Sequence, residues 1–127
     1  MPIQSDVDIV AARQKGRELA VGLGFASADL ALIATAISEL ARNIVLYAQT
    51  GEIVLSTVEN GTRQGIEVVA RDGGPGIADV ERALQEGYST SRSLGLGLPG
   101  VKRLMDEFGI SSEPGSGTTV TVRKWKT

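Results

Sequence analysis

The sequence predicts an α+β fold, a two-layer sandwich in which helices cover one face of a mixed sheet. Helical periodicity dominates residues 5–48, whereas the valine-rich extended segments come later in the chain. No linker, repeat or low-complexity tract divides the 127 residues, and 42% of them are hydrophobic, which is enough for one continuous core. We therefore expect a single domain that spans residues 1–127.

Two helices are expected in the first half of the chain. Ser5 and Asp6 can cap a first helix that ends near Gly22 or Gly24, because short polar residues favour helix starts and glycine favours helix ends. Ser27 is the expected N-cap of a second helix. The apolar residues of this second helix fall on one arc, at Leu30, Ile33, Ile37, Leu40, Ile44 and Ala48.

The next segments predict an antiparallel hairpin. Residues 51–59 and 66–71 are rich in valine and isoleucine, and Asn60-Gly61 between them offers turn chemistry. A short helix is expected at about 78–85, before a polar loop. A further helix is expected to have Pro99 near its first position and to close at Phe108 and Gly109, followed by 110–113, a turn at 114–117 and a strand at 118–125.

Composition narrows the possible chemistry. The 13 basic and 15 acidic residues give a net charge of -2, so no overall positive field favours nucleic acid or an anionic membrane. Zero histidines and zero cysteines exclude imidazole bases, thiol nucleophiles and disulfides. We see no apolar run near the ~18 residues that span a bilayer and no leader at Met1, so we expect a cytoplasmic protein without membrane contact.

Glu39 and Asn43 are the first candidate site residues. They lie four residues apart on the second expected helix, so their side chains share one face, ~6 Å apart along the axis. A carboxylate and a carboxamide there could hold a magnesium ion through oxygen and orient a hydroxyl group. Two solvated helix residues would give the same pattern, so the pair alone is weak evidence.

Asp72 follows an apolar segment and precedes Gly73-Gly74-Pro75-Gly76. A carboxylate at a strand end can accept a hydrogen bond from an amino group such as that of adenine, and glycine beside it lets a flat ring approach the backbone. A tight turn, in which Asp72 bonds its own backbone and the glycines adopt positive φ, explains the same residues. Both interpretations are open at this point.

Residues 95–100, Gly-Leu-Gly-Leu-Pro-Gly, match the spacing G-x-G-x-x-G. A Rossmann dinucleotide site does not fit, because the preceding segment is polar and serine-rich and too short a stretch follows Gly100. A Walker A loop does not fit either, since no Gly-Lys-Ser or Gly-Lys-Thr follows. What remains is a glycine-rich backbone leading into a helix N-terminus, which offers unpaired N–H groups to phosphate. A plain loop before a helix is the alternative.

In chain order these segments resemble the N, G1, G2 and G3 boxes of the GHKL superfamily of ATPases. The matching pieces are Glu39-x-x-x-Asn43, Asp72-x-Gly74-x-Gly76, Gly95-x-Gly97-x-x-Gly100 and Gly117-Thr118. The likeness is closer to the small anti-sigma-factor serine/threonine kinases. Among these, residues 8–14, 36–43 and 98–108 resemble the RsbT-type switch kinases of bacterial stressosomes.

The resemblance implies a Bergerat-type ATP-binding sandwich that uses ATP and Mg²⁺. It implies that Glu39 is catalytic and activates or orients the attacking hydroxyl, that Asn43 ligates the magnesium ion, and that Asp72 recognises the adenine amine. The residues that it assigns to the nucleotide are Asn43, Asp72, Gly74, Gly76, Ile77, Gly95, Leu96, Gly97, Leu98, Gly100 and Thr118. The role of Arg92, in the short lid formed by residues 86–94, stays open.

The resemblance also implies partner proteins. The chain would phosphorylate serine or threonine on a STAS-domain antagonist or scaffold protein of a stressosome and then be released to activate a downstream serine phosphatase. One alternative is a binding module in which ATP only sets the conformation that sequesters a partner. A conformational ATPase like Hsp90 or MutL is less expected, because we see no transducer domain after residue 127.

Overall fold

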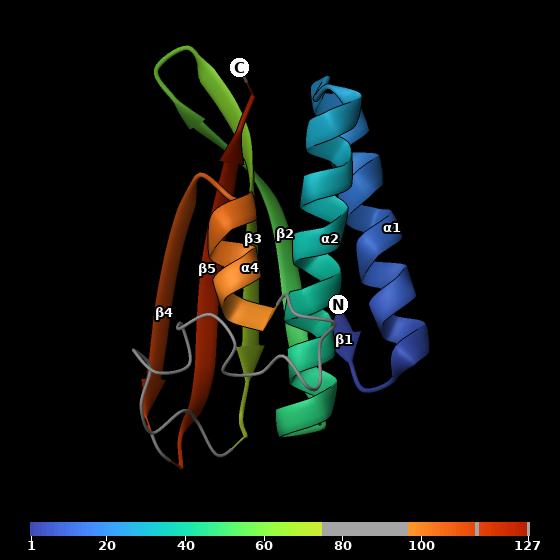
Figure 1. The fold of residues 1–127 in the computed structure, drawn as a ribbon, viewed down its shortest axis with the longest axis vertical. Coiled ribbons are helices and arrows are strands. Elements are labelled where there is room, and N and C mark those ends of the chain that lie inside the picture. Colours follow the sequence, from blue (N-terminus) through green and yellow to red (C-terminus); the bar gives the residue numbers. More distant parts are fainter. Residues whose placement is uncertain (75–96, 114, 127) are drawn as a thin grey trace.

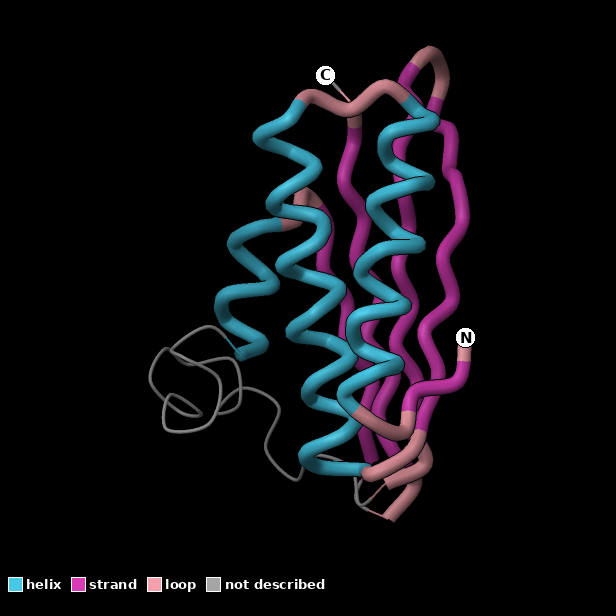
Figure 2. The backbone as a smooth tube through the Cα atoms, turned by 90° about the vertical axis from the view of Figure 1, so that its right-hand side faces the viewer, coloured by secondary structure: helices cyan, strands magenta, loops and turns pink. Residues whose placement is uncertain are grey.

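The computed structural model describes residues 1–74, 97–113 and 115–126. The strands form one five-stranded sheet in the order β1-β2-β3-β5-β4. The helices lie together on one face of this sheet (Figure 1), and the second view shows the resulting two layers (Figure 2). The predicted α+β sandwich is therefore confirmed. The elements are β1 (Pro2–Ile3), α1 (Asp6–Leu23), α2 (Ser27–Asn43), the π-helix η1 (Ile44–Ala48), β2 (Gly51–Asn60), β3 (Arg63–Asp72), α4 (Gly97–Leu104), β4 (Glu107–Glu113) and β5 (Gly117–Trp125).

The sheet differs from the prediction in strand direction. All pairings between the described strands are antiparallel, so the expectation of a mixed sheet is corrected. β2 and β3 form the expected hairpin, in which Asn60 pairs with Arg63. β5 returns between β3 and β4 and runs opposite to both. The sequence pattern marks the strands but carries no signal for the direction of this non-local insertion.

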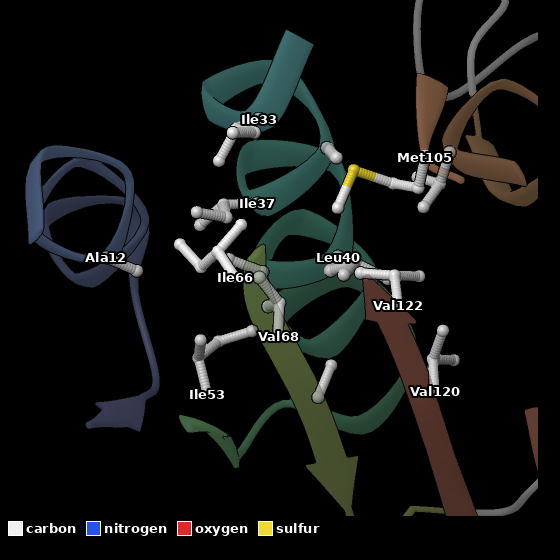
Figure 3. Close-up of a cluster of buried hydrophobic side chains, with 14 of the residues drawn as sticks. Ala12, Ile33, Ile37, Leu40, Ile53, Ile66, Val68, Met105, Val120 and Val122 are labelled. Atoms are coloured by element: carbon white, nitrogen blue, oxygen red, sulfur yellow. The ribbon is translucent and has the colours of Figure 1, made fainter. Parts of the chain in front are cut away.

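The core lies between α2 and the middle of the sheet. Figure 3 shows Ile37 and Leu40 of α2 directed toward the sheet, where Ile66 and Val122 lie, and all four side chains are fully buried. Burial of each such side chain contributes about 1.5–3 kcal/mol. α1 packs closely on α2 at Gly16, where the absence of a side chain leaves room for Ile37. A Cβ atom at this position would lie 2.1 Å from Ile37 Cδ1. The apolar arc predicted for the second helix therefore faces the core.

The helix ends follow the local signals closely at α1 and within one residue at the start of α2. α1 ends as predicted at Gly24, whose φ of 88° suits glycine. The N-cap of α2 is Ala26, and Ser27 is its first helical residue, one position from the prediction. Neither Ser5 nor Ala26 caps its helix through the side chain.

The prediction that Phe108 and Gly109 close the last helix is wrong. α4 ends at Leu104, and both residues lie in β4, where Phe108 pairs with Val122 and Gly109 with Thr121. Pairing with β5 in the β4–β5 hairpin begins before these residues and overrides the local glycine signal. The helix expected at 78–85 lies outside the described residues.

The helical segment Ser27–Ala48 is long and apolar enough to span a membrane by length and composition. The expectation that the chain holds no such segment is wrong on that criterion. A buried core helix meets the same criterion. Here Ile33, Ile37 and Leu40 are fully buried in the core, which accounts for the hydropathy of the segment.

The face of the sheet opposite the helices carries charged side chains. Arg123 Nε donates to Glu67 Oε2 at 2.8 Å, and Arg123 Nη1 donates to Glu107 Oε1 at 3.4 Å. The hydrogen bond and the charge of Glu67 raise the pKa of Arg123 above its ordinary value. Trp125 packs on the same face, with the Arg63 guanidinium 4.6 Å from its ring centroid.

Candidate functional site

Two of the sequence-predicted residues, Asp72 and Thr118, meet at one end of the sheet. In register, Gly51 of β2 pairs with Asp72 of β3, Asp72 pairs with Thr118 of β5, and Thr118 pairs with Ser112 of β4. Paired residues of antiparallel strands point to the same face, so Asp72, Thr118 and Ser112 lie side by side. Ala70, two residues before Asp72, is buried in the core. The row therefore lies on the helix-covered face.

Asp72 forms the side chain-to-backbone contact that the turn interpretation predicts. Its Oδ1 atom accepts a hydrogen bond from the Gly74 backbone N–H at 3.0 Å. The glycines do not behave as that interpretation expects, because neither Gly73 nor Gly74 has positive φ. The turn uses Oδ1 and fixes the orientation of the carboxylate. It leaves Oδ2 as a second acceptor at the strand end.

Two glycines allow close backbone approach around Asp72. At Gly117 φ is 94°, and an added Cβ atom would lie 2.1 Å from the Asp72 carbonyl oxygen. At Gly74 an added Cβ atom would lie 2.7 Å from Ala48 Cβ, at the end of η1. Any larger residue at either position would force the strand end and its neighbours apart. Gly74 also connects the Asp72 turn with the helical segment that carries the other candidate residues.

Glu39 is a buried carboxylate on α2, with an exposure of 4%. Its Oε1 atom accepts from Arg42 Nη1 at 3.2 Å, one turn later on the same helix. A carboxylate held at this depth in a protein needs compensating charge or hydrogen bonds. Its burial argues against the interpretation of Glu39 as a solvated helix residue.

Asn43 is half-buried and is the last residue of α2. The chain continues from it as the π-helix η1, which is rare and frequently occurs at functional sites. The last residue of η1, Ala48, contacts Gly74 in the manner described above. η1 therefore leads from Asn43 to the turn that holds Asp72.

The N-terminus of α4 points toward the same end of the molecule as the C-terminal ends of α2 and β3 (Figure 1). Its first turn holds no acidic residue that would repel an anion, and a helix N-terminus is the end that presents backbone N–H groups to anions. Leu98 and Gly100 are buried. The Leu98 side chain belongs to the hydrophobic core, so this residue offers only its backbone to a ligand.

Four of the predicted site residues lie outside the described part of the chain: Gly76, Ile77, Gly95 and Leu96. Arg92 and the lid at 86–94 lie there too. Within the described residues, no group of three or more acidic residues is placed to hold a metal ion. In this part of the site, a metal ion would therefore have few protein ligands, and the side-chain oxygen of Asn43 is the one that the sequence predicts.

Two site residues are absent from the sequence-based prediction, Arg42 and Ser112. Arg42 stands three residues after Glu39, a helical spacing that brings side chains together, so this contact could have been found. Ser112 is brought beside Thr118 by strand register alone. Nothing in the local sequence reveals that neighbour.

The comparisons with known proteins identify the family of the chain. Residues 28–127 match the family of histidine kinase-, DNA gyrase B- and HSP90-like ATPases. The chain belongs to this family. It is 53% identical over 123 residues to the serine/threonine-protein kinase RsbT of Bacillus subtilis (strain 168). These aligned residues cover 97% of this chain and 92% of the relative. The resemblance to RsbT-type kinases is thereby confirmed.

Anti-sigma F factors are more distant relatives. The protein of Thermoanaerobacter sp. (strain X514) is 33% identical over 103 residues, covering 76% of this chain and 71% of the relative. That of Halalkalibacterium halodurans is 33% identical over 104 residues, with 76% and 69% covered. The family match and the 53% identity to RsbT over nearly the full length together show that the chain is a serine/threonine-protein kinase built on a GHKL ATPase domain.

Proposed function

We propose that this kinase transfers phosphate from ATP to serine or threonine on a STAS-domain antagonist or scaffold protein of a stressosome. After transfer it is released and activates a downstream serine phosphatase. It acts in the cytoplasm as one domain, residues 1–127, without nucleic acid or membrane partners. The pairing of Asp72 with Thr118 on the face that α2 and α4 cover supports the nucleotide site, and the 53% identity to a serine/threonine-protein kinase over 97% of the chain supports phosphotransfer.

The end of the sheet fits the adenine of ATP. Asp72 offers Oδ2 as an acceptor for the exocyclic amine while Oδ1 stays in the turn with Gly74. The absence of a Cβ atom at Gly74 and Gly117 lets Ala48 and the Asp72 backbone pack closely at this strand end, which holds Asp72 in place. Gly76 and Ile77 complete this part of the pocket in the proposal.

The ends of α2 and α4 fit the phosphates. Backbone N–H groups in the first turn of α4, at Gly97, Leu98 and Gly100, would bind phosphate oxygens, together with Gly95 and Leu96. Asn43 would ligate Mg²⁺, which keeps several waters and needs few protein ligands when phosphates bind it too. When bound, ATP would supply the phosphoryl group, and Mg²⁺ would neutralise part of the charge on the phosphates during transfer.

Glu39 is the proposed catalytic residue. Its carboxylate would orient the incoming serine or threonine hydroxyl and accept its proton as the oxygen bonds to the γ-phosphorus of ATP and ADP leaves. Phosphoryl transfer depends mainly on positioning and charge neutralisation, so a carboxylate suffices without histidine. Arg42 holds this carboxylate from one side in the structure.

The test is phosphotransfer to purified STAS-domain proteins with labelled ATP. We expect phosphoserine or phosphothreonine on the STAS protein by mass spectrometry, and its loss with Glu39→Ala. Glu52→Ala is the matched control, because Glu52 is an exposed glutamate paired with Arg71 on the face of the sheet opposite the helices. A nucleotide-dependent complex without any phosphorylated residue would replace the kinase proposal with a sequestering module, as the likeness to anti-sigma F factors suggests.

A further inference from the structure

Ser112 on β4 contacts Thr118 in the row that also contains Asp72. Ser112 Oγ lies 2.9 Å from Thr118 Oγ1, and Ser112 Oγ donates to the Gly117 carbonyl oxygen at 3.2 Å. All of these groups are partly buried. The two hydroxyls therefore form a defined chain of hydrogen bonds at the edge of the candidate nucleotide site.

The number of protons sets the direction of this chain. A serine hydroxyl has one proton, and a carbonyl oxygen can only accept. The bond from Ser112 to the Gly117 carbonyl uses the serine proton, so Thr118 donates in the contact between the two hydroxyls. The Thr118 oxygen then has lone pairs left and no proton to offer.

This polarity matters because Asp72 stands beside Thr118 in register. An ionised carboxylate is also only an acceptor. Side by side, the two residues present acceptors to whatever binds at this end of the sheet. A purine that carries an exocyclic amino group can donate to them, whereas a purine that carries a carbonyl at that position would leave buried acceptors unpaired.

We propose that Ser112 is a specificity-determining positioning residue that fixes the Thr118 hydroxyl as an acceptor and so favours ATP over GTP. The inference rests on the proposed nucleotide site and adds to it a residue that acts through Thr118. A serine that only stabilised the turn before β5 would affect both nucleotides equally. The ratio of the two affinities therefore separates the specificity role from a structural role.

The experiment measures dissociation constants for ATP and GTP by calorimetry in wild type, Ser112→Ala, Thr118→Val and the double variant. We expect Ser112→Ala to lower the preference for ATP by about three- to tenfold, the usual effect of one hydrogen bond. In the Thr118→Val background, Ser112→Ala should have no further effect on the ratio of the ATP and GTP dissociation constants, because the Thr118 hydroxyl that Ser112 orients is absent. Ser112→Thr keeps the hydroxyl and should restore the preference.

Two results would overturn the inference. One is an unchanged affinity ratio in Ser112→Ala, and the other is an equal change of the ratio in the wild-type and Thr118→Val backgrounds. If wild-type protein bound neither nucleotide, the proposed site itself would fail and this inference with it. ATP binding with a normal preference and no response to Ser112→Ala would reject only the role of Ser112.

Discussion

Arg42 Nη1 lies 3.2 Å from Glu39 Oε1, one helical turn away on α2. The side chain of Glu39 is 5% exposed and that of Arg42 is 35% exposed, so the ion pair bridges the interior and the solvent. The arginine compensates part of the cost of burying the carboxylate. It also restricts the carboxylate to an orientation along the helix.

Arg42→Ala should lower the free energy of unfolding by about 1 kcal/mol, a value discounted because the arginine is partly exposed. Urea denaturation measures this effect. In a Glu39→Gln background the loss should be smaller, because the charge that Arg42 compensates is absent. Equal losses in the two backgrounds would show that Arg42 stabilises the fold independently of Glu39.

Glu39→Ala should leave ATP affinity largely intact and slow phosphotransfer by about a hundredfold or more, as expected for loss of a general base. Binding and single-turnover transfer are measured on the same preparation. Glu39→Gln keeps the shape of the side chain and serves as the second variant. Parallel loss of binding and transfer would point to damaged folding, which thermal denaturation would detect.

Asp72→Asn should weaken ATP binding about tenfold to a hundredfold, because a charge-assisted acceptor is lost. The asparagine carbonyl can still accept from Gly74 N–H, so the turn should persist. Its amide nitrogen would instead present a donor to the adenine amine. Asp8→Asn is the matched control, since Asp8 also accepts a backbone N–H, from Gln4 at 2.9 Å, in the loop before α1. Unchanged affinity in Asp72→Asn would remove Asp72 from the nucleotide site.

Local signals explain what the sequence could reveal of the fold. The end of α1 at Gly24 and the hairpin of β2 and β3 depend on glycine chemistry and periodicity within a few residues, and both were predicted correctly. Phe108 was misassigned because its strand exists only through pairing with β5. Gly109 alone resembles a helix end, and only its place in the β4–β5 hairpin shows that it lies within a strand.

The same distinction holds for the candidate site. Glu39 and Asn43 could be grouped from helical spacing alone. Asp72 and Thr118 could be connected only through the family resemblance, because 46 positions separate them in sequence and register alone brings them together. The neighbour of Thr118 on β4, Ser112, belongs to no recognised motif and needed the structure.

Lys124 should position α4. Its Nζ atom donates to the Leu104 carbonyl at 3.0 Å, at the C-terminal end of the helix. Lys124→Met should lower the free energy of unfolding by about 1 kcal/mol and weaken ATP binding moderately, because the helix end loses a charged hydrogen bond. Lys102→Met is the control, since Lys102 is an exposed cation in the last turn of α4. Calorimetry and urea denaturation compare the two, and equal effects would argue against a specific role for Lys124.

Gly117→Ala should cost more stability than Gly115→Ala. Both glycines have positive φ, 94° and 81°, which costs an alanine about 1–2 kcal/mol. Only at Gly117 does an added Cβ atom meet another group, the Asp72 carbonyl oxygen at 2.1 Å, whereas nothing lies within 4 Å at Gly115. The steric conflict should raise the cost at Gly117 to at least about 3 kcal/mol.

Gly117→Ala should also weaken ATP binding. The strands must move apart to relieve the contact between the added Cβ atom and the Asp72 carbonyl oxygen, and this movement separates Asp72 from Thr118. Gly115→Ala should leave the affinity near that of wild type, as it strains the turn without moving the strands. Urea denaturation and calorimetry on both variants test this difference. If the two variants lost equal stability and bound ATP equally well, close approach at Gly117 would not be what holds Asp72 and Thr118 in place.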